Sequence, residues 1–108
     1  PDKSGPVQIS CDNLQQGCQL PNGSTLRVDS APRHSQPFNI LIDKAAQAPS
    51  AEFSMADMDM GFNRYRFVAA SSGWQARVTL PVCVTGSQSW LMDIELDQQR
   101  YRIAFKAL

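Results

Sequence analysis

The sequence has little of what most enzymes need for catalysis. It contains one histidine and three cysteines in 108 residues, and no Gly-x-Ser-x-Gly nucleophile elbow. His34 lies between two prolines in SAPRHSQPF, which predicts an exposed loop residue; the alternative is a metal ligand or a general base. A thiol dyad of Cys83 with His34 is the one catalytic pair that these residue types offer. We therefore expect a protein that is not an enzyme, with a thiol or redox enzyme built on Cys83 as the alternative.

The sequence also lacks an excess of either charge and any long apolar run. Ten basic and ten acidic residues cancel, which gives no basic surface for nucleic acid and no polybasic membrane patch. No apolar stretch approaches the roughly 20 residues that cross a bilayer, so no transmembrane segment is expected. The chain opens on PDKSGP, a polar start without a signal-peptide core, and residues 1–6 are expected to form a flexible segment.

Two of the three cysteines predict a disulfide. Cys11 and Cys18 are seven positions apart in CDNLQQGC, around a Gln-Gln-Gly turn. A loop of this length can close a disulfide, and two free buried thiols are the alternative. The bond would imply an oxidising compartment, so we expect a periplasmic or extracytoplasmic protein. The same compartment suits a lipoprotein whose lipid anchor belongs to an N-terminal segment that this sequence does not include.

Apolar residues at a spacing of two predict an all-β fold. We expect about eight short strands separated by Gly, Pro, Asn and Ser clusters, and no stretch carries a helical period beyond a turn in DKAAQAPSA. This pattern predicts one domain over residues 1–108, a two-sheet antiparallel sandwich of immunoglobulin-like topology, with a small closed barrel as the alternative. The expected core includes Trp74, Val78, Leu80, Trp90, Ile94, Ile103 and Phe105.

The segment FSMADMDMGF holds three of the four methionines. Strand alternation places Met58 and Met60 on one face and Asp57 and Asp59 on the other. Met55 is out of phase with them unless a bulge lies near Ala56, and is expected to continue the apolar face of Phe53. Two interpretations remain open: a core-filling or partner-binding strip of flexible side chains, or a soft-metal site, because thioethers favour Cu(I) over harder ions.

Cys83 lies in LPVCVTG at the end of a predicted strand. Strict alternation from Trp74 places it on the polar face, although a bulge at Pro81 would turn it inward. It is therefore either a small buried hydrophobe or a reactive or metal-binding thiol.

Three segments taken in order resemble a known family pattern. The series FSMADMDMGFNRYRF, GWQARVTLPVCVTG and SWLMDIEL resembles YtkA-like and FixH-like extracytoplasmic domains, which pair an M-x-M segment with a later G-x-W/Y strand pair. The resemblance covers roughly residues 50 to 97. It implies an immunoglobulin-like domain that handles Cu(I) and serves a copper-accepting partner, such as a component of respiratory oxidase assembly. Met58 and Met60 correspond to the methionine motif, whereas Cys83 has no counterpart and nearby histidines are missing.

The first hypothesis is thus a copper-binding or copper-delivery domain that holds Cu(I) through Met58 and Met60, with Met55 or Cys83 as further ligands. The second is a metal-free interaction module in which the same methionines form an apolar contact patch beside a sheet edge. Convergence of the sulfur atoms would separate the two.

Overall fold

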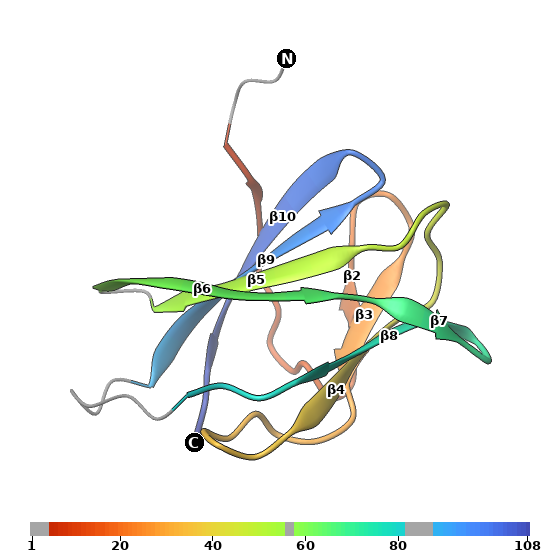
Figure 1. The fold of residues 1–108 in the computed structure, drawn as a ribbon. Coiled ribbons are helices and arrows are strands. Elements are labelled where there is room, and N and C mark those ends of the chain that lie inside the picture. Colours follow the sequence, from red (N-terminus) through yellow and green to blue (C-terminus); the bar gives the residue numbers. More distant parts are fainter. Residues whose placement is uncertain (1–4, 56–57, 82–87) are drawn as a thin grey trace.

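Ten strands in two five-stranded sheets make up the computed structural model of the protein (Figure 1). It describes residues 5–55, 58–81 and 88–108, and for residues 58–62 the backbone alone. In neighbour order, sheet A contains β1 (Val7–Ile9), β10 (Gln99–Lys106), β9 (Ser89–Leu96), β5 (Ser50–Met55) and β6 (Met58–Arg66). Sheet B contains β2 (Cys18–Gln19), β3 (Thr25–Val28), β4 (Phe38–Ile42), β8 (Gly73–Val78) and β7 (Val68–Ala70).

The prediction of a two-sheet sandwich is confirmed, and the described part of the chain contains no helix. The strand count differs from the expected eight for two reasons. The short strand β2 follows the disulfide loop. The predicted run from 62 to 70 is interrupted at Phe67, where β6 of sheet A ends and β7 of sheet B follows. Phe67 is buried, and its N–H donates to the Pro49 carbonyl at 2.9 Å, which fixes the crossing from one sheet to the other.

Alternating side chains of both sheets fill the space between them. In β4, β5 and β9 every second residue is buried, which is the period that the sequence predicts. Five of the seven predicted core residues are buried, namely Val78, Leu80, Trp90, Ile94 and Ile103. Trp74 and Phe105 are partly buried and pack against the margin of this core. Both lie near the end of a strand, Trp74 in β8 and Phe105 in β10.

The predicted disulfide is present. Cys11 and Cys18 are bonded with their Cα atoms 5.5 Å apart, and Cys18 is buried beside β3. The loop between them turns on Asn13, whose side-chain oxygen accepts the N–H groups of Gln15 and Gln16. A short polar turn thus brings the two sulfur atoms together, as the spacing indicates.

The N-terminal strand closes sheet A from the far end of the sequence. β1 pairs with β10 in parallel, with Val7 opposite Tyr101 and Ile9 opposite Ile103, whereas the other strand pairs run antiparallel. The sequence pattern did not predict this parallel pair. Within the described residues, no helix is long and apolar enough to cross a membrane.

Candidate functional site

The methionine segment lies at one end of sheet A, where β5 ends and β6 begins. Met55 is the last residue of β5, and Met58, the first residue of β6, is its direct cross-strand partner. Met55 is 3% exposed and belongs to the core with Phe53, as the alternation predicts. The structure describes the backbone of Met58 and Met60 but not their side chains.

A register shift decides which face of β6 the position of Met58 belongs to. Phe53 pairs with Asn63, but Met55 pairs with Met58, so Ser54 alone faces the segment 59–62. Residues directly opposite each other in an antiparallel pair belong to the same face. In a regular strand Met58 would share a face with Arg64, which is exposed on the outer surface. Because of the irregularity, the position of Met58 lies opposite Met55, which is a core residue. Met55 and the position of Met58 therefore belong to the same face, as expected if a bulge intervenes.

Trp90 flanks Met55 on its other side. It lies at the start of β9, directly opposite Met55 across the β5–β9 pair, and is 1% exposed. Its indole N–H donates a hydrogen bond to Nε2 of His34 at 2.9 Å. The two ring centroids are 5.9 Å apart at an interplanar angle of 48°. The cross-strand row at this end of sheet A therefore runs Phe105, Trp90, Met55, Met58.

His34 is not the exposed loop residue that its flanking prolines indicated. It is half-buried, its N–H donates to the Leu108 carbonyl at 3.0 Å, and it forms a β-bridge with Leu80. The prediction was wrong because the loop is held along two chain segments that are distant in sequence. Since Nε2 accepts the Trp90 N–H, this arrangement requires the neutral ring with its proton on Nδ1.

Cys83 lies outside the described residues, and its predicted roles stay predictions. The residues on either side of this segment lie at the methionine end: Leu80 bridges to His34, and the Gln88 carbonyl accepts the Ala107 N–H. Among the described residues, no group of three or more His, Cys, Asp or Glu side chains could hold a metal ion.

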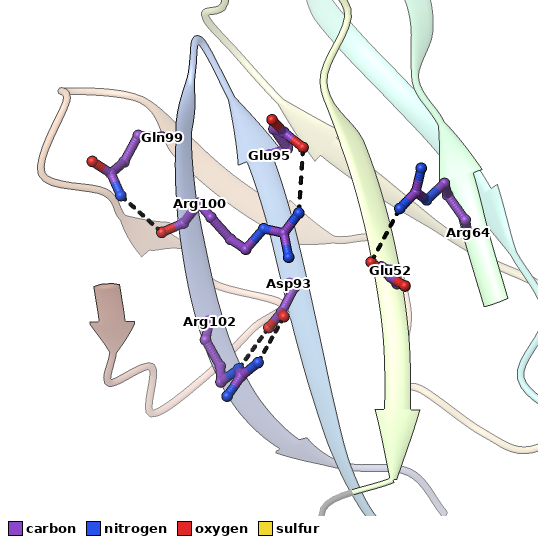
Figure 2. A network of polar contacts seen from close by, with 7 residues as sticks. All are labelled: Glu52, Arg64, Asp93, Glu95, Gln99, Arg100 and Arg102. Atoms are coloured by element: carbon purple, nitrogen blue, oxygen red, sulfur yellow. Dashed lines mark hydrogen bonds and ion pairs between the residues drawn. The ribbon is translucent and has the colours of Figure 1, made fainter. Parts of the chain in front are cut away.

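The outer face of sheet A carries a different set of side chains, shown in Figure 2. Arg102 donates to both carboxylate oxygens of Asp93, at 2.8 and 2.9 Å, and these hydrogen bonds raise the pKa of the guanidinium. Arg100 pairs with Glu95 at 3.6 Å, and Arg64 with Glu52 at 3.4 Å. Opposite charges on neighbouring strands thus neutralise one another, which is typical of a solvated sheet face and not of an anion-binding site.

A shallow depression of about 240 Å³ lies at the other end of the sandwich. It is lined in part by Arg27, Leu41, Asp43 and Gly73 on sheet B. Its volume is below the range of about 300–1,000 Å³ that is usual for pockets that enclose a small molecule. It lies at the end of β4 that pairs with Trp74, away from the methionine segment.

The sequence pattern brought Met55, Met58 and Trp90 to attention one by one, but not as neighbours. Only the strand order, in which β5 lies between β6 and β9, puts the three in one row. The contact of His34 with Trp90 joins residues 56 positions apart and had no local signal in the sequence. Comparison with known proteins found no matching family model, no matching curated protein and no matching solved structure.

Proposed function

We propose that this protein is an extracytoplasmic domain that binds Cu(I) through methionine thioethers and passes it to another protein. The ligands in this proposal are Met58 and Met60 at the start of β6, with Met55 at the end of β5. The observation that supports it best is the register shift, because it sets the position of Met58 directly opposite Met55. Side chains at such positions start from Cβ atoms about 4.5–5.5 Å apart, within reach of a shared ion.

The chemistry of the donor atoms selects the metal. Thioethers are soft, neutral ligands that suit Cu(I), whereas Mg²⁺, Ca²⁺ and Mn²⁺ prefer oxygen. The described residues provide no cluster of carboxylate, imidazole or thiolate ligands that would favour a harder ion. The disulfide between Cys11 and Cys18 supports an oxidising compartment. The acceptor in this proposal is a copper-binding protein, such as a component of respiratory oxidase assembly.

An anaerobic Cu(I) titration against a competing chelator tests the proposal. We expect one Cu(I) per chain in the parent protein, and a loss of affinity of at least about tenfold in the double variant Met58→Leu, Met60→Leu. Leucine keeps the apolar volume, at a stability cost under about 1.5 kcal/mol per site. Met92→Leu is the matched control, because Met92 is equally apolar but pairs with Phe53 in the middle of the sheet. Unchanged affinity in the double variant, or no binding by the parent, would overturn the proposal.

The pH dependence of binding tests the place of Cys83 in the site. Thioethers need no deprotonation, so a site made of methionines alone keeps its Cu(I) affinity as the pH falls toward 5. A site that includes the Cys83 thiolate loses affinity over the same range, because protons compete with the metal for sulfur. Titrations of the parent and of Cys83→Ser at pH 7 and pH 5 separate the two versions.

A metal-free interaction module is the second candidate, and the position of β6 favours it. β6 is the longest of the described strands and lies at the edge of sheet A, with nine residues beside the six of β5. An edge strand offers backbone groups to an added strand of a partner. The two functions differ in one measurement, since an interaction module predicts no Cu(I) binding by the parent protein.

A further inference from the structure

We propose that β6 takes up an extended acidic segment of another protein as an added strand, with two carboxylates of that segment opposite Arg64 and Arg66. The proposal goes beyond copper binding, because it uses no methionine side chain, and it gives the interaction module a partner of defined chemistry. It rests on residues 63–66, the part of β6 whose side chains the structure describes.

The backbone of β6 is open on the side away from β5. β6 is the last strand of sheet A, and β5 is the one described strand that pairs with it. The N–H of Phe67 donates to the Pro49 carbonyl, on the β5 side. Because the N–H and C=O groups of successive strand residues point in opposite directions, those of Arg66 and Arg64 point away from β5. Each arginine therefore offers a backbone donor and acceptor to a further strand.

The arginine side chains of this edge are available to a partner. Both are exposed, and strand alternation places both on the outer face of sheet A. Arg64 reaches Glu52 at 3.4 Å through one nitrogen, and its side chain remains 66% exposed (Figure 2). Arg66 lies opposite Ser50 and forms no ion pair with any described residue. The edge thus carries positive charge that its neighbours in the sheet leave largely uncompensated.

The same sheet contains an example of the partner's chemistry. The tripeptide Arg-Tyr-Arg occurs twice in the chain, at residues 64–66 in β6 and at residues 100–102 in β10. In the β10 copy each arginine pairs with a carboxylate of β9, the first with Glu95 and the second with Asp93 (Figure 2). The residue between these two carboxylates, Ile94, is buried in the core. We expect the partner of β6 to alternate acidic and apolar residues in the same way.

A second copy of this chain is a poor occupant of the edge. An antiparallel pairing of two β6 strands centred on Tyr65 would set Arg64 of each copy opposite Arg66 of the other. Like charges directly opposite each other destabilise a strand pair. Charged residues on edge strands are a common means of preventing such self-association. The charges of this edge therefore favour a partner strand of the opposite sign.

A peptide titration followed by NMR tests the proposal. The probe is the acetylated and amidated peptide Thr-Thr-Asp-Ile-Glu-Thr-Thr, and the control peptide has Asn and Gln in place of the two acids. We expect the acidic peptide to slow amide exchange at Arg64 and Arg66, whose N–H groups become hydrogen-bonded. Exchange at Tyr65 should not change, because its N–H already faces β5. The neutral peptide should bind at least about threefold more weakly, within the range expected for the loss of two exposed ion pairs.

N-methylated peptides test the backbone part of the proposal. In an antiparallel addition the N–H of each acidic residue faces β6, whereas the N–H of the isoleucine faces away. Methylation of the aspartate nitrogen should therefore abolish binding, and methylation of the isoleucine nitrogen should be tolerated.

Arginine variants test the contribution of charge. Arg64→Gln, Arg66→Gln should lose at least about threefold in affinity for the acidic peptide. The matched control is Arg27→Gln, Arg77→Gln, which removes the same charge from exposed positions on the outer face of sheet B. This control should bind the acidic peptide as the parent protein does.

Three results would overturn the proposal. The first is unchanged amide exchange in β6 at millimolar concentrations of the acidic peptide. The second is equal binding of the acidic and neutral peptides, which would leave an edge strand without preference for acidic partners. The third is protection of Arg64 and Arg66 that rises with protein concentration in the absence of peptide, which would make a second copy the occupant. None of them changes the outcome of the Cu(I) titration, so the copper proposal and this one fail independently.

Discussion

The two ends of the sandwich differ in the group that accepts a hydrogen bond from a tryptophan indole. β9 runs from the methionine end, at Trp90, to the Asp97 end, where the β9–β10 hairpin turns (Figure 1). Each end holds a tryptophan whose indole N–H needs an acceptor. At the Asp97 end, Trp74 donates to a backbone carbonyl, that of Ala45, at 3.2 Å. At the methionine end, Trp90 donates to the side chain of His34 at 2.9 Å.

The difference lies in how each acceptor is held. A backbone carbonyl is fixed by the course of the chain, whereas an imidazole is held by its side-chain torsion angles and its contacts. The indole acceptor at the Asp97 end is therefore part of the backbone, whereas the acceptor at the methionine end is a side chain that a single substitution removes.

Truncation of the two tryptophans should produce the largest difference between the ends. Trp90→Ala removes a 1% exposed ring from the core, and such changes cost about 3–5 kcal/mol. Trp74→Ala should cost clearly less, because that ring is only partly buried. Urea denaturation of both variants gives the free energies of unfolding. An equal or larger loss in Trp74→Ala would contradict the comparison.

Removal of the His34 acceptor should produce the next largest effect. His34→Ala leaves the N–H of Trp90 without its partner, and an unsatisfied buried donor costs about 1–3 kcal/mol. His34→Gln is the matched control, since its side-chain oxygen can accept the same hydrogen bond. Thermal melts should therefore place His34→Gln between the parent protein and His34→Ala. Equal stability of His34→Ala and the parent would show that the bond contributes nothing.

Substitution of Asp97 tests the stability of the other end of the sandwich. Its carboxylate accepts the N–H groups of Ala46 and Gln47 at 3.0–3.2 Å, which ties the loop before β5 to the hairpin turn. Asp97→Ala should destabilise the protein by about 1–2 kcal/mol and increase amide exchange at Ala46 and Gln47. Asp97→Asn keeps one acceptor and tolerates the positive φ of 49° at this position, so it should lose less. Unchanged amide exchange in Asp97→Ala would contradict the assignment.

Substitution of Asp29, at the methionine end, should have a smaller, pH-dependent effect on stability. Burial tends to raise the pKa of Asp29, but hydrogen bonds from Asn39, together with those from its own backbone and from Ser30, outweigh this and lower it. Because the folded pKa is below the unfolded value, the stabilisation is present above about pH 4 and is lost as the pH falls through the folded pKa. Asp29→Asn should therefore be less stable than the parent at pH 6, with a smaller difference at pH 3. A difference that widens in acid would have the wrong sign.

Much of the fold could be predicted because burial repeats along each strand. In β5 and β9 the apolar residues fall on every second position, and the structure buries those positions. The disulfide followed from its short polar loop in the same way. The crossing of the chain at Phe67 and the parallel pairing of β1 could not be predicted, because both depend on which strands become neighbours and leave no local period.

The candidate site was predictable only in its parts. The methionine spacing pointed to Met58 and Met60, and strand phase pointed to a buried Met55, which the structure confirms. The register shift brings the position of Met58 opposite Met55. It arises because one residue of β5, Ser54, faces residues 59–62 of β6. His34 was misjudged for a similar reason, since its contacts come from segments far away in sequence.

The parallel pairing of β1 with β10 has a consequence for the order of assembly. The two strands stand at opposite ends of the sequence, so their contact closes a loop that contains nearly the whole chain. The entropy lost in closing so long a loop is recovered only when the strands in between are already paired. β1 should therefore be the last strand to dock during folding and the first to detach, and its three amides should exchange with solvent before those of β9. We therefore expect the other strands of the two sheets to assemble before the N-terminal strand docks.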